Sequence, residues 1–324
     1  MTVMKFGGTS VADPEKIQSA AGRVIAEKKR GKAVVVVVSA PGEMTDELLT
    51  LSSRIAKNAS PREKDQLITT GEIVGVSLFA IACLEGGSPA VSLSAAQAGI
   101  EATGPYGNAD ISRLRPQRIL RELEDGKIVV VAGFQGMNAA KDVVSLGRGG
   151  SDLTATVLAA KLKASSCMIF SDVRGIYTAD PRMVAKARVL KTISLLDMIE
   201  LSRCGSQVMQ LRSLEVAKKY RVPIHLRSAF HTDEGTLIDP YLKEEEKSPV
   251  TALAFEKKDS EALISAVGPF AHLKPEIKTG IISELKKKKI KIISIRRGFR
   301  RLSVSVHRMD GEAALNAVHK ACRP

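Results

Sequence analysis

The chain has 324 residues, of which 44% are hydrophobic and 26% charged, and this length suffices for one large α/β domain and a smaller one. No apolar run reaches the roughly 18–20 residues that span a bilayer, and the first residues lack the basic and apolar regions of a signal peptide. Because the four cysteines show neither metal nor redox spacing, we expect a reduced, cytoplasmic protein without a membrane partner.

The net charge of +14 is unevenly distributed. From Thr251 onward, 16 Lys or Arg stand against 7 Asp or Glu, a net +9, which leaves +5 for the first 250 residues. Such a basic region could bind nucleic acid. Phe299 is the only aromatic residue among the crowded charges of residues 286–301 that could stack on a base. We therefore favour a solvated helix end and hairpin, and expect no nucleic-acid partner.

Strands and helices alternate along most of the chain. Apolar runs predict buried strands, of the kind found in parallel sheets, at residues 3–6, 33–38, 90–93, 127–132, 166–170 and 223–227. Helical patterns are predicted at residues 13–25, 65–85, 113–123, 152–161, 194–201 and 213–220. This alternation predicts an α/β domain whose mostly parallel sheet is covered by helices on both faces, a three-layer αβα arrangement.

The last quarter of the chain has a different pattern. Two prolines and a charged run mark residues 236–249 as a linker between a domain at 1–235 and one at 250–324. Beyond the linker, residues 263–267, 275–289, 290–295, 302–306 and 312–322 follow the order β-α-β-β-α, and residues 250–255 could add a strand. This order predicts a small α+β module of about 70 residues, short for a fully independent core.

A glycine-rich motif, Leu-Gly-Arg-Gly-Gly-Ser-Asp-Leu-Thr at residues 146–154, precedes a predicted helix. Gly149 and Gly150 would let the backbone approach a ligand closely. The free N–H groups and positive dipole of a helix N-terminus suit phosphate or carboxylate. Arg148 adds a guanidinium fork for a carboxylate. A tight strand-to-helix turn with a solvated arginine is the alternative, and the motif alone does not decide between them.

Polar residues and glycines follow several other predicted strands. In open α/β sheets, ligands bind beyond the carboxyl ends of the strands. Residues at such ends, or on the helices that follow them, are Lys5, Gly7, Gly8, Ser39, Thr45, Ser171, Asp172, Tyr177 and Arg182. Glu72 falls among apolar residues of a predicted helix, where a carboxylate is costly unless it is paired. Each has a simpler alternative: a solvated lysine or glutamate, a helix cap, or a surface loop.

Taken together, five segments resemble the aspartate kinases of the amino-acid kinase superfamily. They are Lys5-Phe6-Gly7-Gly8-Thr9-Ser10-Val11, Ser39-Ala40 with Thr45, Gly71-Glu72, residues 147–152, and residues 171–182. The match runs in order over roughly residues 1–240, which makes chance a poor explanation. The region from about Val250 resembles an ACT module, the ligand-sensing domain that such kinases carry. The resemblance therefore implies the amino-acid kinase fold for residues 1–235 and an ACT-like fold for residues 250–324.

The resemblance implies ATP-dependent phosphorylation of the L-aspartate β-carboxylate to 4-phospho-L-aspartate, the first step of lysine, threonine and methionine biosynthesis. ATP and Mg²⁺ would be the cofactors, with magnesium bridging the phosphates and no protein metal site. No general base is required, because the acceptor carboxylate is already ionised. Catalytic roles fall on Lys5, Gly8 and Asp152; acceptor binding on Thr45, Glu72, Arg148, Gly149, Gly150 and Ser151; nucleotide binding on Lys5, Phe6, Gly7, Gly8, Ser39, Ser171, Asp172, Tyr177, Arg182 and Gln207.

Within that set, the resemblance gives each group a task. Lys5 and the amides of Gly7 and Gly8 would hold the transferred phosphate, and Asp152 would orient Lys5. Arg148 would take the α-carboxylate of aspartate, and Glu72 its amino group. Phosphoryl transfer asks a protein mainly for such alignment and charge neutralisation.

The sequence also departs from the family pattern. Gln207 stands where many relatives have a lysine, and glutamine can donate a hydrogen bond but brings no charge. Relatives usually carry two ACT modules, and this chain has room for about one. Residues 296–301 read Arg-Arg-Gly-Phe-Arg-Arg where relatives place polar effector contacts. We therefore expect weak or absent feedback inhibition by lysine, and a homodimer joined at least partly through residues 250–324.

Two alternatives remain. One is another carboxylate, carbamate or nucleotide kinase of the same superfamily. The other is a non-catalytic homologue that keeps the fold for ligand sensing. The Lys-Phe-Gly-Gly-Thr-Ser run and the combination of Glu72 with Arg148 favour an amino-acid acceptor, and the joint presence of Lys5, Arg148 and Asp152 favours a catalyst.

Overall fold

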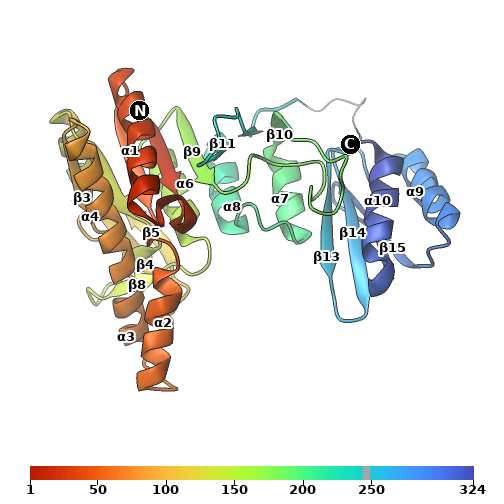
Figure 1. Cartoon of the computed structure of the whole chain (residues 1–324), viewed down its shortest axis with the longest axis horizontal. Helices are drawn as coiled ribbons and strands as arrows, with labels where there is room; N and C mark the ends of the chain where they lie inside the picture. The colour runs from red at the N-terminus through yellow and green to blue at the C-terminus, as the bar shows by residue number, and fades with distance from the viewer. Residues whose placement is uncertain (244–248) are drawn as a thin grey trace. The chain divides into compact units, whose positions relative to one another are not determined.

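The computed structural model describes residues 1–243 and 249–324, and its contacts divide the chain into two compact units. The first unit comprises Met1–Arg174 and Lys219–Asp233, and the second comprises Gly175–Lys218 and Glu234–Pro324 (Figure 1). The chain thus passes between units three times, whereas the sequence predicted one linker at 236–249. Residues 236–239 of that linker form a strand, and residues 244–248 lie outside the described residues. The single boundary stays a prediction.

The main sheet of the first unit has six parallel strands in the order β11-β9-β1-β2-β6-β3. Their bounds are β1 Thr2–Phe6, β2 Val34–Val38, β3 Ala90–Leu93, β6 Ile128–Ala132, β9 Ser166–Ser171 and β11 Ile224–Ser228. All five valines of β2 are fully buried, as expected for a parallel strand covered on both faces. These six strands confirm the six predicted from apolar runs.

Helices cover both faces of this sheet, which confirms the α/β class. Side chains alternate along β1, so Met4 and Phe6 join a core with α1 and α4, while Lys5 points to α6 on the other face. The helices are α1 Pro14–Lys29, α2 Met44–Ile55, α3 Pro61–Ile68, α4 Thr70–Glu85, α5 Gln117–Glu124 and α6 Gly150–Lys161, with a short 3₁₀ turn at Gly8–Val11. The predicted start of α1 is confirmed, since Asp13 accepts a hydrogen bond from the Lys16 amide at 2.9 Å.

Two predicted helices are corrected. Residues 65–85 form the end of α3 and all of α4, with a break at Thr69, whose carbonyl accepts from the Gln135 side chain at 3.1 Å. In the predicted helix 113–123, Arg113 and Leu114 belong to a strand, and the helix begins only after Pro116. A proline disfavours helical backbone in the residue before it.

A small second sheet in the first unit was not predicted. Its order is β5-β4-β7-β8, with β4 Ile100–Thr103, β5 Asp110–Leu114, β7 Gln135–Met137 and β8 Val143–Ser145. None of these strands exceeds five residues, too short for a clear alternating pattern. Strand β8 leads directly into the glycine-rich motif, so this sheet places the start of that motif.

The helical stretch Pro61–Glu85 is, within the described residues, long and apolar enough to cross a membrane, and half of its most apolar window is buried. Length and composition are weak evidence, because core helices pass the same test. Here α4 packs against α1 and strands β2, β3 and β6, and it carries the buried carboxylate of Glu72. We interpret the stretch as a core element of the sheet's helical layer.

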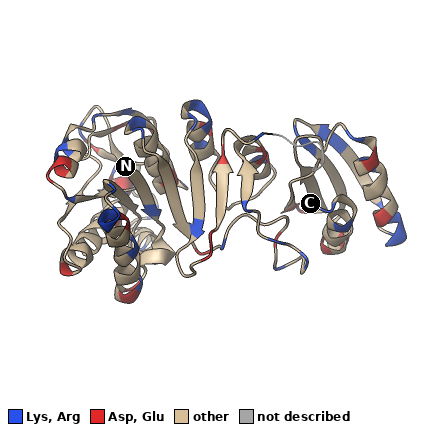
Figure 2. Cartoon of the chain, turned by 90° about the horizontal axis from the view of Figure 1, so that it is seen from above, with Lys and Arg blue, Asp and Glu red and all other residues tan. Residues whose placement is uncertain are grey.

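The second unit contains an antiparallel sheet in the order β13-β14-β16-β15, packed against two helices. The elements are β13 Ala252–Lys257, β14 Glu261–Val267, α9 Pro275–Lys287, β15 Ile292–Gly298, β16 Arg301–His307, a 3₁₀ turn at Arg308–Asp310 and α10 Gly311–Cys322. The predicted order β-α-β-β-α is confirmed, β13 completes the sheet, and the whole fits an ACT-like region. Lys and Arg residues occur along the chain in both units (Figure 2).

The rest of the second unit precedes this module in the chain. Its elements are β10 Thr192–Ser194, α7 Leu195–Arg203, α8 Leu211–Tyr220 and β12 Thr236–Asp239. Strands β10 and β12 pair in parallel, and α7 packs on both of them as well as on β13 and β14. The segment between β9 and β10, which holds Tyr177 and Arg182, packs into the same hydrophobic core as the ACT-like module through Ala179 and Val184.

Candidate active site

The Lys5 ammonium and the Asp152 carboxylate form an ion pair at the carboxyl end of the main sheet. Lys5 Nζ lies 2.7 Å from Asp152 Oδ1, and the side chains are only 13% and 12% exposed. Lys5 is on β1 and Asp152 in the first turn of α6, so the pair joins the central strand to the helix that follows the glycine-rich motif. The ammonium also lies over Gly7, where an added Cβ would stand 3.3 Å from Nζ. A partly buried cation is thus held at a strand end.

The N-terminus of α6, the positive end of its dipole, lies at the same edge. Its N-cap, Gly149, has φ +72°, a left-handed conformation that favours glycine. Arg148, next to it, is exposed, and among the described residues its side chain makes neither an ion pair nor a hydrogen bond. A positive helix end and an unpaired guanidinium therefore stand together, as the binding of an anion requires.

Backbone segments from three elements come unusually close at this edge. The Gly42 amide donates to the Gly8 carbonyl at 3.0 Å, and a Cβ at Gly8 would lie 2.7 Å from the Ala40 carbonyl oxygen. Ser39 Oγ donates to Ser151 Oγ at 3.0 Å, which ties the end of β2 to α6. One continuous surface at this edge is therefore formed by the loop after β1, the loop after β2 and the start of α6.

Glu72 is a carboxylate buried without a cation. The residue is 2% exposed, Oε1 accepts from the Ala40 amide at 3.2 Å, and Oε2 has no hydrogen-bond partner. Burial raises the pKa of Glu72 to about 8, and the hydrogen bond from Ala40 only partly opposes this. Because such a group costs stability, it fits a place that a ligand cation completes. Thr45 lies half-buried in the first turn of α2, after the same strand end as Ala40.

The predicted nucleotide residues fall into three groups. Phe6 is fully buried: its ring stacks on Phe170 with the ring centroids 4.6 Å apart, and its carbonyl accepts from the Ser39 amide at 3.2 Å. In the first unit, Ser171 Oγ donates to Asp172 Oδ1 at 2.9 Å just after β9. In the second unit, Tyr177 is half-buried and pairs by backbone with Val189, Arg182 is exposed and pairs with Asp180 at 2.7 Å, and Gln207 is exposed between α7 and α8.

Two buried residues that were not predicted support the motif. Asp65 accepts from the amides of Gly107 and Ser145 at 2.9 and 2.8 Å, and from Ser145 Oγ at 2.7 Å. Gln135 accepts from the Ala95 amide at 3.3 Å and donates to Thr69. Together they anchor the loop before the glycine-rich motif and the turn before α4. The available signal was an acid at a core-facing helical position, as for Glu72.

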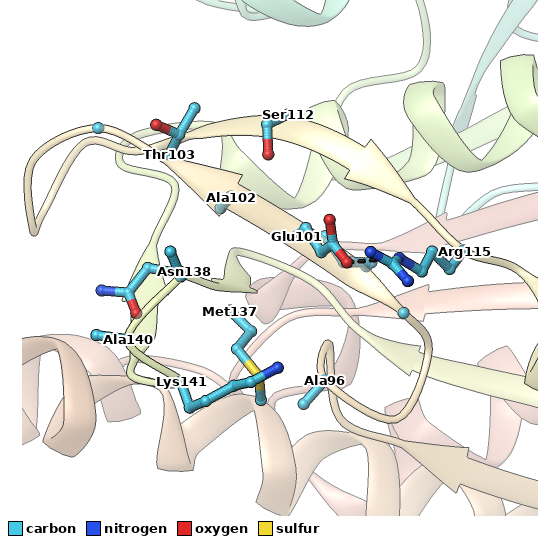
Figure 3. A pocket seen from close by; sticks show the side chains of 14 residues that line it. Ala96, Glu101, Ala102, Thr103, Ser112, Arg115, Met137, Asn138, Ala140 and Lys141 are labelled. Carbon is cyan, nitrogen blue, oxygen red and sulfur yellow. Dashed lines mark ion pairs between the residues drawn. The ribbon is translucent and has the colours of Figure 1, made fainter.

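A hollow of the first unit lies elsewhere, on the small sheet. It has a volume of about 790 Å³, and its lining includes Glu101, Arg115, Met137 and Lys141 (Figure 3). Glu101 and Arg115 already neutralise each other at 2.6 Å. None of the predicted site residues lines this hollow. The glycine-lined sheet edge, rather than this hollow, is therefore the candidate active site.

Comparison with known proteins agrees with this geometry. Residues 1–228 match the family described as "Amino acid kinase family". The chain belongs to this family. Aspartokinase 2 of Bacillus subtilis is 48% identical over 264 residues, which are 82% of this chain and 65% of the relative. This family member thus spans slightly less than two thirds of the length of the curated relatives it matches.

Solved structures of aspartate kinases share the fold of this family member. The Clostridium acetobutylicum enzyme has a TM-score of 0.79 at 20% identity, covering 100% of this chain and 99% of that one. E. coli aspartokinase III, in complex with aspartate and ADP, has a TM-score of 0.71 at 23% identity, covering 100% and 84%. At these identities the likeness supports the fold.

Proposed function

We propose that the protein is an aspartate kinase that transfers the γ-phosphoryl group of ATP to the β-carboxylate of L-aspartate, giving 4-phospho-L-aspartate and ADP. The observation that carries this proposal is the pair of uncompensated groups at the sheet edge: among the described residues, Glu72 is buried with an unpartnered oxygen, and Arg148 is exposed without a partner. An α-amino acid brings one ammonium and one carboxylate, and so compensates both. Curated relatives at 45–48% identity carry the name aspartokinase, which supports the same acceptor.

Each group then has a task that follows from its surroundings. Arg148 binds the α-carboxylate through its guanidinium fork, with the backbone of Gly149 and Gly150 and the Ser151 hydroxyl beside it. Glu72 binds the α-ammonium, and Thr45 and Ser39 complete the polar wall. Lys5 and the Gly7 and Gly8 amides neutralise the phosphoryl group during transfer, while Asp152 holds Lys5 in position. The β-carboxylate attacks as an anion, so no residue needs to remove a proton.

Magnesium fits this arrangement as an ion held mainly by phosphate oxygens. Among the described residues, no group of three His, Cys, Asp or Glu side chains converges on one point, and the Asp152 carboxylate is engaged with Lys5. Such a sparse donor set suits Mg²⁺, which usually keeps its waters and bridges phosphates. When bound, it would neutralise charge on the transferred group. We assign the nucleotide to Ser171, Asp172, Tyr177, Arg182 and Gln207.

The test is a panel of acceptors with magnesium-ATP: aspartate, glutamate, acetylglutamate, carbamate and UMP. We expect robust ADP release with aspartate alone, and a hydroxamate when hydroxylamine traps the acyl phosphate. Comparable turnover with glutamate or UMP would show that aspartate is not the specific acceptor. Absence of turnover with every acceptor would favour a ligand-sensing homologue.

We also propose a cytoplasmic homodimer that acts at the start of lysine, threonine and methionine biosynthesis. All four cysteines are free and buried, as in a reducing compartment. One ACT-like sheet leaves an edge uncovered, and pairing with a second copy would cover it. Light scattering of the full chain tests the assembly, since a monomer would contradict it. Titration with lysine and threonine tests feedback, which we expect to be weak.

A further inference from the structure

The segment assigned to the nucleotide is bonded to the last helix of the ACT-like module, and both belong to the second unit. Thr178, next to Tyr177, is fully buried. Its amide donates to the Arg188 carbonyl at 3.0 Å, and its carbonyl accepts from the Leu253 amide of β13 at 2.8 Å. Its hydroxyl accepts from the Arg188 amide at 3.2 Å and lies 3.0 Å from His319 Nε2 on α10. Thr178 is therefore fixed on one side to its own hairpin and on the other to the module.

The Thr178–His319 hydrogen bond can run in either direction. The Thr178 hydroxyl accepts from the Arg188 amide and keeps its proton and a second lone pair, so it can donate to or accept from His319 Nε2. Burial lowers the pKa of His319, and the nearby Arg188 charge lowers it further. Both effects favour the neutral imidazole, whose tautomer sets the direction of the bond.

Two further contacts join α10 to the same segment. Asn316 Nδ2 donates to the Met183 carbonyl at 2.9 Å, one residue beyond Arg182. Ala179 and Val184 belong to one hydrophobic cluster with Ala314, Leu315 and Val318 of α10. Tyr177 and Arg182 thus each have a chain neighbour, Thr178 and Met183, that is hydrogen-bonded to α10.

We propose that α10 positions the nucleotide-binding segment, with His319 and Asn316 as positioning residues, so that the KM for ATP depends on the packing of this helix while the KM for aspartate does not. The inference rests on the proposed function, because it takes Tyr177 and Arg182 as nucleotide contacts. The acceptor groups Glu72 and Arg148 belong to other elements, α4 and the start of α6, in the first unit. By linkage, anything that displaces α10 must weaken nucleotide binding, and a bound nucleotide must resist that displacement to the same extent.

The experiment compares full-length His319→Ala and Asn316→Ala with the matched control Lys320→Ala. Lys320 is the next residue on α10, but it pairs with Glu284 of α9 at 3.0 Å. We expect His319→Ala and Asn316→Ala each to raise the KM for ATP and the Kd of magnesium-ADP about fivefold, while the KM for aspartate stays within about twofold. Lys320→Ala should change neither constant. His319→Gln, which can still accept from Thr178, should recover most of the nucleotide affinity.

The possible results separate this inference from the proposed function. If the wild-type protein binds magnesium-ADP and both alanine variants bind it equally well, or if the KM for aspartate rises as much as that for ATP, the positioning role is wrong and the kinase assignment stands. If the wild type phosphorylates another acceptor but the ATP constants shift as expected, the acceptor is wrong and the positioning role stands. If the wild type binds no nucleotide, both fall. Thermal melting shows whether His319→Ala is folded, and Asn316→Ala, on an exposed side chain, provides a gentler variant.

Discussion

The two units treat their buried charges in opposite ways. At the sheet edge of the first unit, Glu72 is buried with one unpartnered oxygen and Arg148 has no partner among the described residues. In the second unit, Arg300 pairs with Asp197 at 2.8 Å, with side chains 5% and 4% exposed, and Arg301 pairs with Glu200 at 2.8 Å. Uncompensated charge marks a place that a ligand completes, whereas compensated charge joins α7 to the hairpin of the ACT-like module.

This difference corrects the interpretation of residues 296–301. The sequence suggested four arginines that would together repel a lysine effector. Two of them, Arg300 and Arg301, are already paired within the unit, so only Arg296 and Arg297 remain exposed to oppose an effector cation. The electrostatic repulsion of a lysine effector is therefore smaller than the sequence suggested. The titration with lysine is correspondingly a more informative test of feedback.

The largest effect expected from this comparison is on Lys5, whose charge is paired in the free protein yet serves the reaction. Lys5→Ala should lower kcat about a thousandfold, because the cation neutralises charge that develops during transfer. Because Asp152, 12% exposed, would lose its counter-charge, the melting temperature should also fall, and kcat is measured well below it. Lys16→Ala, which removes an exposed lysine paired with Asp13 at 2.6 Å, is the control and should leave kcat unchanged. A Lys5→Ala protein with near-native kcat would make the Lys5–Asp152 pair structural, like the pairs of the second unit.

Breaking a compensated ion pair of the second unit should lower stability and leave the kinetic constants unchanged. Asp197→Ala leaves the buried Arg300 without its main counter-charge and should lower the free energy of unfolding by about 3 kcal/mol, measured by urea denaturation. The KM for aspartate should not change. Arg203→Ala, which removes an exposed partner 3.9 Å from Glu200, should cost less than about 0.5 kcal/mol. Equal losses in the two variants would mean that burial of these pairs does not set their strength.

Aspartate binding should depend on the shape of the Arg148 side chain as well as on its charge. Arg148→Lys keeps the charge but loses the two-pronged contact, so we expect the KM for aspartate to rise about tenfold with the KM for ATP unchanged. Steady-state kinetics with each substrate varied in turn gives both constants. Arg115→Lys, in the hollow of the small sheet, is the control. An equal rise in both constants would place Arg148 on the phosphates instead.

The protonation of Glu72 should make aspartate binding depend on pH. Because the pKa of Glu72 is raised to about 8, the free protein holds a proton that the substrate ammonium must displace. The KM for aspartate should therefore fall about twentyfold between about pH 6.5 and about pH 8.5, and calorimetry in buffers of different ionisation enthalpy should detect proton release on binding. Glu72→Gln should remove this dependence and weaken binding.

The same shift affects the ligand-free fold. Because the pKa of Glu72 is raised, the folded state holds more protons than the unfolded state between about pH 4.5 and about pH 8. The stability that the protonated Glu72 contributes to the fold is therefore lost as pH rises through about 8. Stability of the Glu72→Gln variant should lack this decline. An unchanged decline would assign the titration to another group.

Much of the fold followed from the sequence, because buried parallel strands such as β2 consist of apolar residues alone and need no partner to be recognised. The break at Thr69 did not, because it depends on a hydrogen bond from Gln135, which is 66 residues distant. In the site, the apolar neighbours of Glu72 predicted its burial. The unpartnered oxygen did not follow, since pairing depends on elements that meet only in the folded chain. For the same reason the pairing of Arg300 and Arg301 was missed.

The position of Lys5 on β1 has a consequence for the order in which activities are lost as the protein opens. Strand β1 is bonded on both sides, to β2 and β9, and the neighbouring Phe6 ring is fully buried. The backbone amides of β1 should therefore exchange with solvent only when most of the first unit unfolds. Tyr177, in contrast, belongs to a hairpin outside the sheets, held by backbone hydrogen bonds from the Thr178 amide to Arg188 and from the Leu190 amide to Ile176. Because this hairpin is not a strand within a sheet, hydrogen exchange in mild denaturant should release its amides before those of β1, and nucleotide affinity should fade while the lysine that serves the transfer is still in place.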